Sequence, residues 1–352
     1  MSEINNADVF DGFPLIIGWE LTLQCDLRCT HCGSSAGISR AEELTTHEAL
    51  DLCDQFPSLL VQEVDFTGGE PLLRHDWSEI AERLIELGVQ VNVLTNGLKL
   101  DHSRVDELLE VGVSCLGISL DGLEATHDRL RDRPGSFAAI EQGVKITLEA
   151  GMPLNIITTV SSANLAELPA MADLLESWGV ETWRPQPLFP SGRALLHPGL
   201  MIDRQTVVQL GQFIRSHRRD SLDKRLNIVC ADGMQYVEEE VAGSRPWRGC
   251  SAGFSACGIT SDGRVKGCLS LPDEVVEGNL RERTLWDIWF DPHAFEYTRG
   301  FSEHRLGENC RDCPMGNECK GGCSVNSYCS TGQFHNDPLC FLATPGIDDA
   351  IA

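Results

Sequence analysis

Three cysteines near the start of the chain are spaced so that they could hold a metal cluster. Cys25, Cys29 and Cys32 follow the first predicted strand in the pattern C-x3-C-x2-C. Three thiolates on one loop can bind three irons of a four-iron cubane. The fourth iron then has no protein ligand and can bind a small molecule, much as catalytic zinc sites keep one position open. A structural zinc site would need a fourth ligand, and His31, between two of the cysteines, is awkwardly placed to supply it.

Glycine-rich and polar motifs follow the next three predicted strands. In chain order they are Thr67-Gly68-Gly69-Glu70-Pro71, Thr95-Asn96-Gly97 and Ser119-Leu120-Asp121-Gly122. Paired glycines let a backbone approach a ligand closely, Glu70 offers a carboxylate, and the small polar side chains suit the hydroxyl and amine groups of a nucleoside. Each motif alone is compatible with an ordinary turn. Together with the cysteine loop, four such strand endings favour one shared site.

A second set of cysteines lies in the last third of the chain. Cys250, Gly263 and Cys268 fit the pattern C-x12-G-x4-C, and residues 261–264 form a hairpin-turn pattern in which glycine tolerates a positive φ. A run with the spacing C-x2-C-x5-C-x3-C and one later cysteine follow, namely Cys310, Cys313, Cys319, Cys323 and Cys340. A zinc ribbon would explain the C-x2-C part alone. All seven cysteines are too many for one zinc ion and wrongly arranged for two.

Composition restricts the class of protein. The chain has 352 residues, a net charge of −25 and 15 cysteines. The charge argues against binding to nucleic acid or anionic membranes, because phosphate contacts need clustered Lys and Arg. The N-terminus lacks the pattern of a secretory signal, and no apolar stretch is long enough to span a bilayer. We therefore expect a cytoplasmic protein whose clustered, odd-numbered cysteines bind metal rather than form disulfides.

The first 187 residues alternate between strand and helix patterns. The predicted strands are residues 15–23, 63–66, 90–94, 115–120, 154–160 and 180–186. Thr45 with Glu48 and Asp76 with Glu79 form capping-box patterns ahead of two helices, and a further helix is predicted over residues 136–150. Six β–α repeats imply a parallel sheet, but a closed barrel has eight. The predicted fold class is α/β, a partial (β/α)6 barrel with a small, cysteine-rich C-terminal iron–sulfur domain.

The predicted organisation has five parts. They are residues 1–13 as a tail, 14–187 as the partial barrel, 188–246 as a connecting helical segment, 247–345 as the auxiliary-cluster domain and 346–352 as a second tail. The connecting segment includes a predicted helix over residues 205–218. In the auxiliary-cluster domain, short cysteine- and glycine-rich segments replace the regular patterns, so we expect metal to hold it together more than an apolar core.

Several basic residues follow the predicted strands. His127, Arg129, Arg131 and Arg133 come after the fourth strand, near the expected mouth of the barrel. They are compatible with binding a carboxylate or a peptide backbone, and equally with a solvated loop. Arg193, after the sixth strand, is a weaker candidate for a contact with cofactor or substrate.

With these motifs the chain resembles the radical S-adenosylmethionine (SAM) superfamily, in the branch with a C-terminal SPASM domain. The resemblance covers roughly residues 14–343. It implies that Cys25, Cys29 and Cys32 ligate a 4Fe–4S cluster whose open iron is chelated by the methionyl group of SAM. It also implies that SAM is contacted by residues of the strand-end motifs, namely Gly68, Gly69, Glu70, Asn96, Ser119 and Asp121. Reductive cleavage of SAM would release a 5′-deoxyadenosyl radical, which abstracts a hydrogen atom from the substrate.

The resemblance further implies two auxiliary 4Fe–4S clusters, which makes three clusters in all. Because relatives interleave the ligands, Cys250, Cys268 and Cys323 would serve one cluster, with Cys257 as its fourth ligand. The other cluster would be held by Cys310, Cys313, Cys319 and Cys340. A cluster in which cysteine ligates every iron has no position for a substrate, so such clusters favour electron transfer over substrate binding. Cys329 is left over and is predicted to be inert.

The substrate class follows from the resemblance alone. SPASM enzymes mostly modify peptides or proteins, so we predict a ribosomally made peptide that is crosslinked, epimerised or oxidised, with a ferredoxin or flavodoxin as electron donor. A sulfatase-maturase-like reaction is an alternative, although Leu269 and Gly33 stand where those enzymes have an aspartate and an aromatic residue. Cofactor or tetrapyrrole biosynthesis is another alternative. A non-catalytic iron–sulfur electron carrier is a further alternative. Electron transfer alone, however, does not require an iron without a protein ligand next to a SAM site.

Overall fold

A ten-stranded sheet forms the centre of the molecule. The computed structural model describes residues 12–219, 225–230, 234 and 248–341, and the sheet has the order β10-β9-β8-β1-β2-β3-β4-β5-β6-β7. Its main part is six parallel strands, β1 Ile16–Thr22, β2 Glu63–Gly68, β3 Gln90–Thr95, β4 Cys115–Ser119, β5 Leu154–Val160 and β6 Thr182–Pro187. The predicted strands and the open, partial barrel are therefore confirmed.

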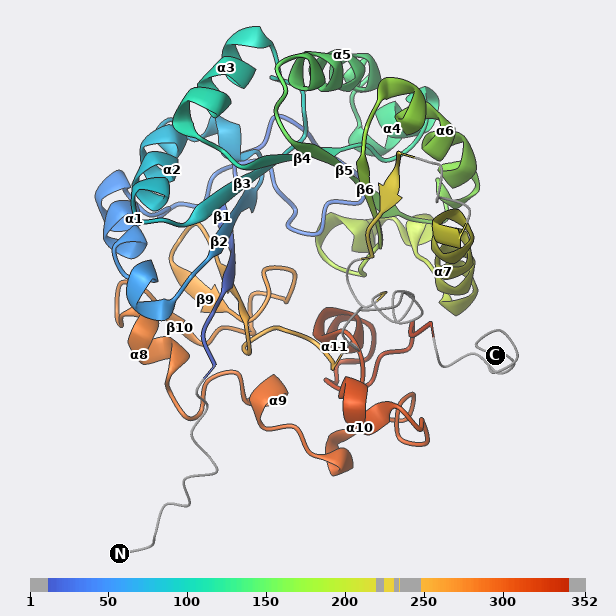
Figure 1. Cartoon of the computed structure of the whole chain (residues 1–352). Coiled ribbons are helices and arrows are strands. Elements are labelled where there is room, and N and C mark those ends of the chain that lie inside the picture. The colour runs from blue at the N-terminus through green and yellow to red at the C-terminus, as the bar shows by residue number, and fades with distance from the viewer. Residues whose placement is uncertain (1–11, 220–224, 231–233, 235–247, 342–352) are drawn as a thin grey trace, which may run out of the picture.

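Helices cover the outer face of this sheet (Figure 1). They are α1 Thr46–Cys53, α2 Trp77–Glu86, α3 His102–Val111, α4 Glu124–Arg131, α5 Ser136–Glu149, α6 Leu168–Trp178 and α7 Arg204–Arg219. Along β1, Trp19 is fully buried and packs edge to face on Phe56 and Phe66. Its neighbours Gly18 and Glu20 face the inside of the barrel, because side chains alternate across a strand.

The two predicted capping boxes have different outcomes. At α1 the box is present, with the Thr45 hydroxyl accepting from the Glu48 N–H and the Glu48 carboxylate accepting from the Thr45 N–H. At α2 the prediction is wrong, because Asp76 makes no capping hydrogen bond. Its carboxylate accepts instead from Arg74 Nε and the Thr46 hydroxyl, both at 2.6 Å. A buried guanidinium nearby therefore outcompetes the helix N-terminus for this side chain.

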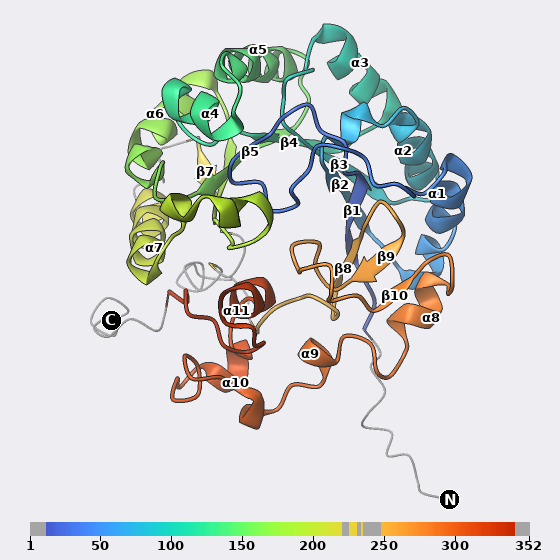
Figure 2. The ribbon, with the colours of Figure 1, turned by 180° about the vertical axis from the view of Figure 1, so that it is seen from behind.

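The C-terminal region continues the same sheet. Its strands are β8 Ala256–Ile259, β9 Arg264–Lys266 and β10 Gly278–Asn279, while β7 Asn227–Ile228 joins the opposite edge. Strand β8 pairs in parallel with β1, and β9 pairs antiparallel to β8 across the predicted hairpin turn. Figures 1 and 2 show helices α9 Glu296–Arg299, α10 Gly316–Cys319 and α11 Ser324–Thr331 on the open side of the curved sheet, while α8 Leu285–Trp289 lies beside α1.

The apolar core also extends into this region. Val265, Ile288, Trp289 and Phe295 are buried in the same core cluster as Trp19 of β1. The expectation that metal matters more than an apolar core therefore does not hold for residues 256–295, which pack against the barrel.

Some predictions lie outside the described residues. These are residues 1–11 of the first tail, residues 220–224, 231–233 and 235–246 of the connecting segment, residues 247 and 342–345 of the auxiliary-cluster domain, and the whole second tail, residues 346–352. Among the described helices, none combines the length and apolar character that crossing a bilayer requires.

Candidate active site

The cysteines of the first loop border one cavity at the carboxyl ends of the strands. This cavity has a volume of about 240 Å³ and is lined by Cys25, Cys29 and Cys32 together with residues from the ends of β2 to β6. Cys29 is buried, and the other two are half-buried. Burial raises the pKa of Cys25 to about 11, so a metal has to stabilise the thiolate before this residue can act as a ligand.

Two glycines bring the end of β2 against the cysteine loop. A Cβ atom on Gly69 would lie 2.1 Å from the carbonyl oxygen of Gln24, and one on Gly68 would lie 2.3 Å from that of Thr22. The φ of Gly68 is +131°, a value that other residues rarely adopt. Both glycines line the cavity, and they therefore present backbone groups to whatever occupies it.

Glu70 lies behind the cavity. Its carboxylate is 1% exposed and accepts hydrogen bonds from the Thr95 hydroxyl at 2.9 Å and the Asn96 N–H at 2.7 Å. Burial raises the pKa of Glu70 to about 7, although these hydrogen bonds act in the opposite direction. Glu70 is not among the described residues that border the cavity. In this geometry it holds the end of β3 in place, and its predicted contact with SAM stays a prediction.

Asn96 and Ser119 do border the cavity. The Asn96 Nδ2 group donates to Asp26 Oδ1 at 2.7 Å and lies 4.0 Å from Cys25 Sγ. It therefore ties the end of β3 to the cysteine loop. Ser119 ends β4 on the far wall and is half-buried, so both residues are placed to meet a ligand in the cavity.

Asp121 has a different environment from the one predicted. It is fully buried, accepts from the Thr159 N–H at 2.9 Å, and pairs with His31 Nε2 at 3.0 Å and Arg131 Nη2 at 2.6 Å. Burial acts to raise the pKa of Asp121, but Arg131 and His31 outweigh it and hold the pKa far below its usual range. The carboxylate is turned towards these cations and is not among the described groups that border the cavity, and its predicted contact with SAM stays a prediction.

Two arginines surround Cys29. Arg131 Nη1 donates to Cys29 Sγ at 3.8 Å, and Arg193 Nε donates to the Cys29 carbonyl oxygen at 2.8 Å. Both arginines line the cavity, whereas Arg129 and Arg133 are exposed. Of the predicted basic residues after the fourth strand, Arg131 is the one that reaches the cysteine loop.

A larger cavity adjoins the first. Its volume is about 790 Å³, within the usual range for small-molecule sites, and Gly33 and Ser34 border both cavities. Much of its wall is apolar and comes from Leu23, Pro190, Leu195, Leu269, Leu271, Pro272 and Tyr328. Cys329, predicted to be inert, also lines it.

Three basic side chains converge on one carboxylate beside this larger cavity, and two of them, Arg40 and Lys266, border it. Arg40 Nη1, Arg264 Nη2 and Lys266 Nζ lie 3.3, 3.0 and 3.6 Å from oxygens of Asp273. The Asp273 side chain is 54% exposed, while that of Lys266 is 3% exposed. Sequence analysis missed this cluster because no spacing signals it, as Arg40 and Asp273 are 233 positions apart.

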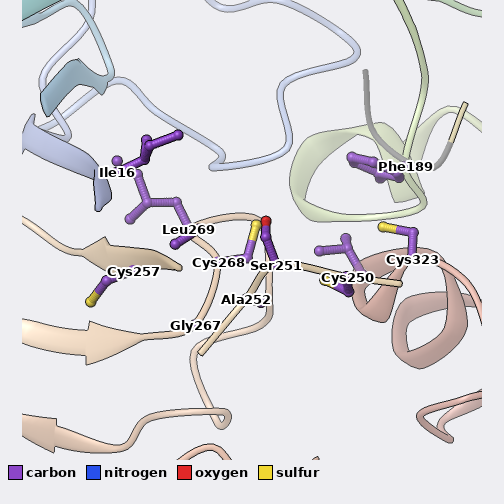
Figure 3. Close-up of a pocket in the computed structure, with 13 residues that line it drawn as sticks. Ile16, Phe189, Cys250, Ser251, Ala252, Cys257, Gly267, Cys268, Leu269 and Cys323 are labelled. Atoms are coloured by element: carbon purple, nitrogen blue, oxygen red, sulfur yellow. The ribbon is translucent and has the colours of Figure 1, made fainter. Parts of the chain in front are cut away.

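A third cavity, of about 230 Å³, gathers cysteines of the C-terminal region. Cys250, Cys268 and Cys323 border it, and Figure 3 shows them around a common space. Cys257 borders it as well, but its sulfur is directed away from the other three (Figure 3). The structure thus brings three of the four predicted ligands together.

A buried hydroxyl supports a cluster at this place. The Tyr297 hydroxyl has no hydrogen-bond partner among the described residues. It packs against Gly267, the neighbour of Cys268, where a Cβ atom added to the glycine would lie 2.0 Å from the hydroxyl oxygen. A buried donor without an acceptor is unfavourable. Cluster sulfur accepts hydrogen bonds, so the three thiols and this hydroxyl fit an iron–sulfur cluster.

Three of the remaining predicted ligands, Cys310, Cys313 and Cys319, lie in and just before α10. Cys340 as the fourth ligand stays a prediction. Cys310 is close enough to Cys313 and Cys319 for their charges to interact, and it accepts from the Asp337 N–H. The Asp337 carboxylate in turn accepts from the Cys323 N–H at 3.2 Å. Asp337 therefore links the two groups of C-terminal cysteines.

These cysteine groups are not single-ion sites. Within the described ranges, no three or more His, Cys, Asp and Glu residues are arranged to hold one metal ion. A four-iron cluster is larger than one ion and takes thiolate ligands. The thiol groups gathered here are the ligand type that such a cluster takes.

Comparisons with known proteins agree with this chemistry. The radical SAM superfamily matches residues 19–175, and the iron–sulfur cluster-binding domain SPASM matches residues 250–314. An AdoMet-dependent heme synthase from Methanosarcina barkeri is 32% identical, covering 95% of this chain and 97% of that protein. A PqqA peptide cyclase from Granulibacter bethesdensis is 26% identical, covering 94% and 88%. The structure of Streptococcus suis SuiB bound to S-adenosylmethionine has a TM-score of 0.74 at 20% identity and covers 94% of this chain and 76% of SuiB, which shows a shared fold.

These matches span almost the whole chain and include both cysteine regions. The two domains imply S-adenosylmethionine and 4Fe–4S clusters as cofactors. The chain belongs to the radical SAM superfamily and is a radical SAM enzyme with a SPASM iron–sulfur domain.

Proposed function

We propose that this enzyme cleaves SAM reductively and abstracts a hydrogen atom from a tetrapyrrole that carries carboxylate side chains. The observation that carries the proposal is the pair Arg40 and Lys266, which border the cavity that adjoins the cysteine loop and both approach Asp273. Apolar walls suit the ring of a tetrapyrrole, and basic side chains at the edge suit its carboxylates.

Cys25, Cys29 and Cys32 hold the SAM-binding 4Fe–4S cluster in this proposal, because they share one cavity. When bound, that cluster supplies the electron that splits SAM. Gly68 and Gly69 meet SAM with their backbone groups, while Asn96 and Ser119 contribute polar side chains to the same cavity. Glu70 holds the β3 ending against the loop.

Two auxiliary clusters complete the cofactor set, with three clusters in total and about 12 irons per chain. Cys250, Cys268 and Cys323 serve one of them, and the other is held by Cys310, Cys313, Cys319 and Cys340. A ferredoxin or flavodoxin delivers electrons to the enzyme.

In this proposal Asp273 occupies the place of a substrate carboxylate. Asp273 is half exposed on the segment that lines the cavity. Arg40 and Arg264 also pair with Glu20 and Asp262, so Lys266 is the cation that depends most on Asp273, and charge-assisted pairs of this kind bind carboxylates well. A substrate carboxylate displaces Asp273 and takes over its ion pairs. The name of the 32% identical relative, a heme synthase, supports a tetrapyrrole as the molecule that brings the carboxylate.

A peptide substrate is the second candidate. The PqqA peptide cyclase, similar over 94% of this chain, favours it, and a peptide carboxylate would suit the same basic side chains. The lower identity of that relative, 26% against 32%, puts the tetrapyrrole first.

A binding experiment tests the proposed substrate class. The anaerobic, cluster-loaded enzyme is titrated with an iron porphyrin that has free propionates and with its methyl ester, and binding is followed by absorbance. We expect the free acid to bind at least tenfold more tightly and Arg40→Gln, at a residue that lines the cavity, to reduce that preference. Arg283→Gln, which breaks an ion pair with Asp291 instead, is the matched control. Equal binding of acid and ester would contradict the proposal.

A further inference from the structure

Strand β8 turns Cys257 away from the other auxiliary cysteines. In the β1–β8 pairing, Cys257 lies opposite Ile17 and Gly258 lies opposite Gly18. A Cβ on Gly258 would be 2.7 Å from the Leu269 nitrogen, and one on Gly18 would be 3.3 Å from the Leu269 side chain. This face of the strands therefore looks towards Cys268 and Leu269. Because side chains alternate, Cys257 points to the opposite face, as Figure 3 shows for its sulfur.

The surroundings of Cys257 are those of a structural thiol. It is 2% exposed and belongs to the same apolar core cluster as Ile17. Burial raises the pKa of Cys257 to about 12, as it does for Cys53, another thiol of this core. The charges that act most on Cys257 are those of Arg299 and Glu277, not those of other cysteines.

No other cysteine takes its place. The sequence has none between Cys230 and Cys250, and Cys230 is buried in the apolar core. Cys329 lines the larger cavity instead. The auxiliary cavity therefore has three cysteines directed into it, one thiolate fewer than a cubane has irons.

We propose that Cys250, Cys268 and Cys323 are the only cysteine ligands of this auxiliary cluster, and that its fourth iron is open to a carboxylate or a small anion. The inference rests on the proposed function for the identity of the cofactor and for the substrate carboxylate. Leu269 borders both this cavity and the larger one, so a carboxylate of a bound substrate is the nearest source of a ligand. The auxiliary cluster then binds a ligand in addition to transferring electrons.

The test uses a full-length variant in which Cys25, Cys29 and Cys32 are all alanine, so that only auxiliary clusters contribute. After anaerobic reconstitution we expect about 8 irons per chain. Adding Cys257→Ala leaves the iron count and the reduced EPR spectrum unchanged, and Cys53→Ala is the matched control for loss of a buried thiol. Adding Cys268→Ala removes about 4 irons.

Cyanide is the probe for an open iron. We expect it to shift the EPR signal of the reduced triple variant, with or without Cys257→Ala, and to leave the signal unshifted once Cys268→Ala is added. Loss of about 4 irons on Cys257→Ala but not on Cys53→Ala would overturn the proposal, and so would a spectrum that cyanide leaves unchanged. Ser251 also lines the cavity. If Ser251→Ala abolishes the shift that cyanide causes in the EPR signal, the proposal that the fourth iron is open is overturned.

The experiment is independent of SAM cleavage and of substrate turnover. Without the first cysteine loop the variant makes no 5′-deoxyadenosine, so iron count and EPR report on the auxiliary site alone. An enzyme that responds to cyanide but never acts on a tetrapyrrole would leave this inference standing and remove the proposed substrate.

Discussion

At Glu70 a buried carboxylate joins two strand ends by accepting hydrogen bonds from Thr95 and Asn96. Asp121 has a comparable position one strand further along, where it pairs with His31 of the cysteine loop. Both residues belong to motifs that sequence analysis read as ligand contacts. A motif carboxylate can therefore serve a site by holding its walls, and spacing alone does not separate this role from direct binding.

The raised pKa of Glu70 predicts a pH dependence of stability. Burial raises this pKa from an ordinary value near 4.5 to about 7, so the folded protein binds a proton that the unfolded chain releases. The resulting stabilisation is full below about pH 4.5 and is lost as pH rises through about 7, with a limit of about 3 kcal/mol. Chemical unfolding of the as-isolated protein gives its free energy of unfolding at pH 5 and at pH 8. Between these two pH values, this free energy should fall more for wild type than for Glu70→Gln. If the free energy of unfolding changes equally with pH in the two proteins, Glu70 is not the group that binds the proton on folding.

Arg131 is expected to tune the SAM-binding cluster. Its guanidinium donates to Cys29 Sγ at 3.8 Å, and a cation beside a cluster favours the reduced, more negative state. Arg131→Met combined with Asp121→Asn, which avoids an unpaired buried charge, should lower the midpoint potential measured by EPR-monitored redox titration. Arg129→Met, on the same helix but exposed, should leave the potential where it is. Equal potentials in the two variants would show that Arg131 has only a structural role.

At the level of the elements, the contact between β2 and the cysteine loop leaves no room for a side chain. A Cβ on Gly69 would lie 2.1 Å from the Gln24 carbonyl oxygen, so Gly69→Ala has to push the loop away from the strand end. We expect this change to lower 5′-deoxyadenosine formation by about 100-fold, the scale that a misplacement of about 1 Å produces. The auxiliary clusters should stay in place by iron count. Gly199→Ala, with open space at its Cβ, is the control, and equal rates for both variants would contradict the prediction.

The elements also show which parts of the fold can be predicted from sequence. The six long strands and α1 have clear apolar patterns, turn residues or caps, and they occur where predicted. Strand β8 has only four residues and no recognisable period, and its partner β1 lies about 240 positions earlier. Short strands whose pairing is decided by distant residues leave no local pattern, so the sheet that links barrel and C-terminal region was not predicted.

The whole molecule has one continuous sheet and one main core. Because β8 covers the edge of β1 and Trp289 packs into the same core as Trp19, the barrel is incomplete without the C-terminal region. A chain ending at residue 247 should be insoluble or should lose cooperative thermal unfolding, because it exposes a strand edge and core surface. A monomeric fragment that unfolds cooperatively near the melting temperature of the full chain would show that the barrel is an independent domain.

At this scale the candidate site was only partly predictable. The cysteine ligands are visible because their chemistry requires fixed spacings, as in Cys25, Cys29 and Cys32. The basic cluster on Asp273 has no such spacing, because Arg40 and Arg264 meet only when β9 is brought beside the barrel. The resemblance predicts Cys257 as a ligand, and that role stays a prediction. The pleat of β8 directs its sulfur away from the other three cysteines, a feature that position in the sequence does not reveal.

The measurement that tests the account most directly is turnover under anaerobic conditions. The cluster-loaded enzyme is mixed with SAM, dithionite and an iron porphyrin with free propionates, and mass spectrometry follows 5′-deoxyadenosine and the porphyrin together. We predict 5′-deoxyadenosine in step with a changed porphyrin mass, and neither product from Cys29→Ala. 5′-Deoxyadenosine with an unchanged porphyrin, alongside a modified peptide in a parallel reaction, would contradict the tetrapyrrole assignment. No 5′-deoxyadenosine with any substrate would contradict the proposed chemistry itself.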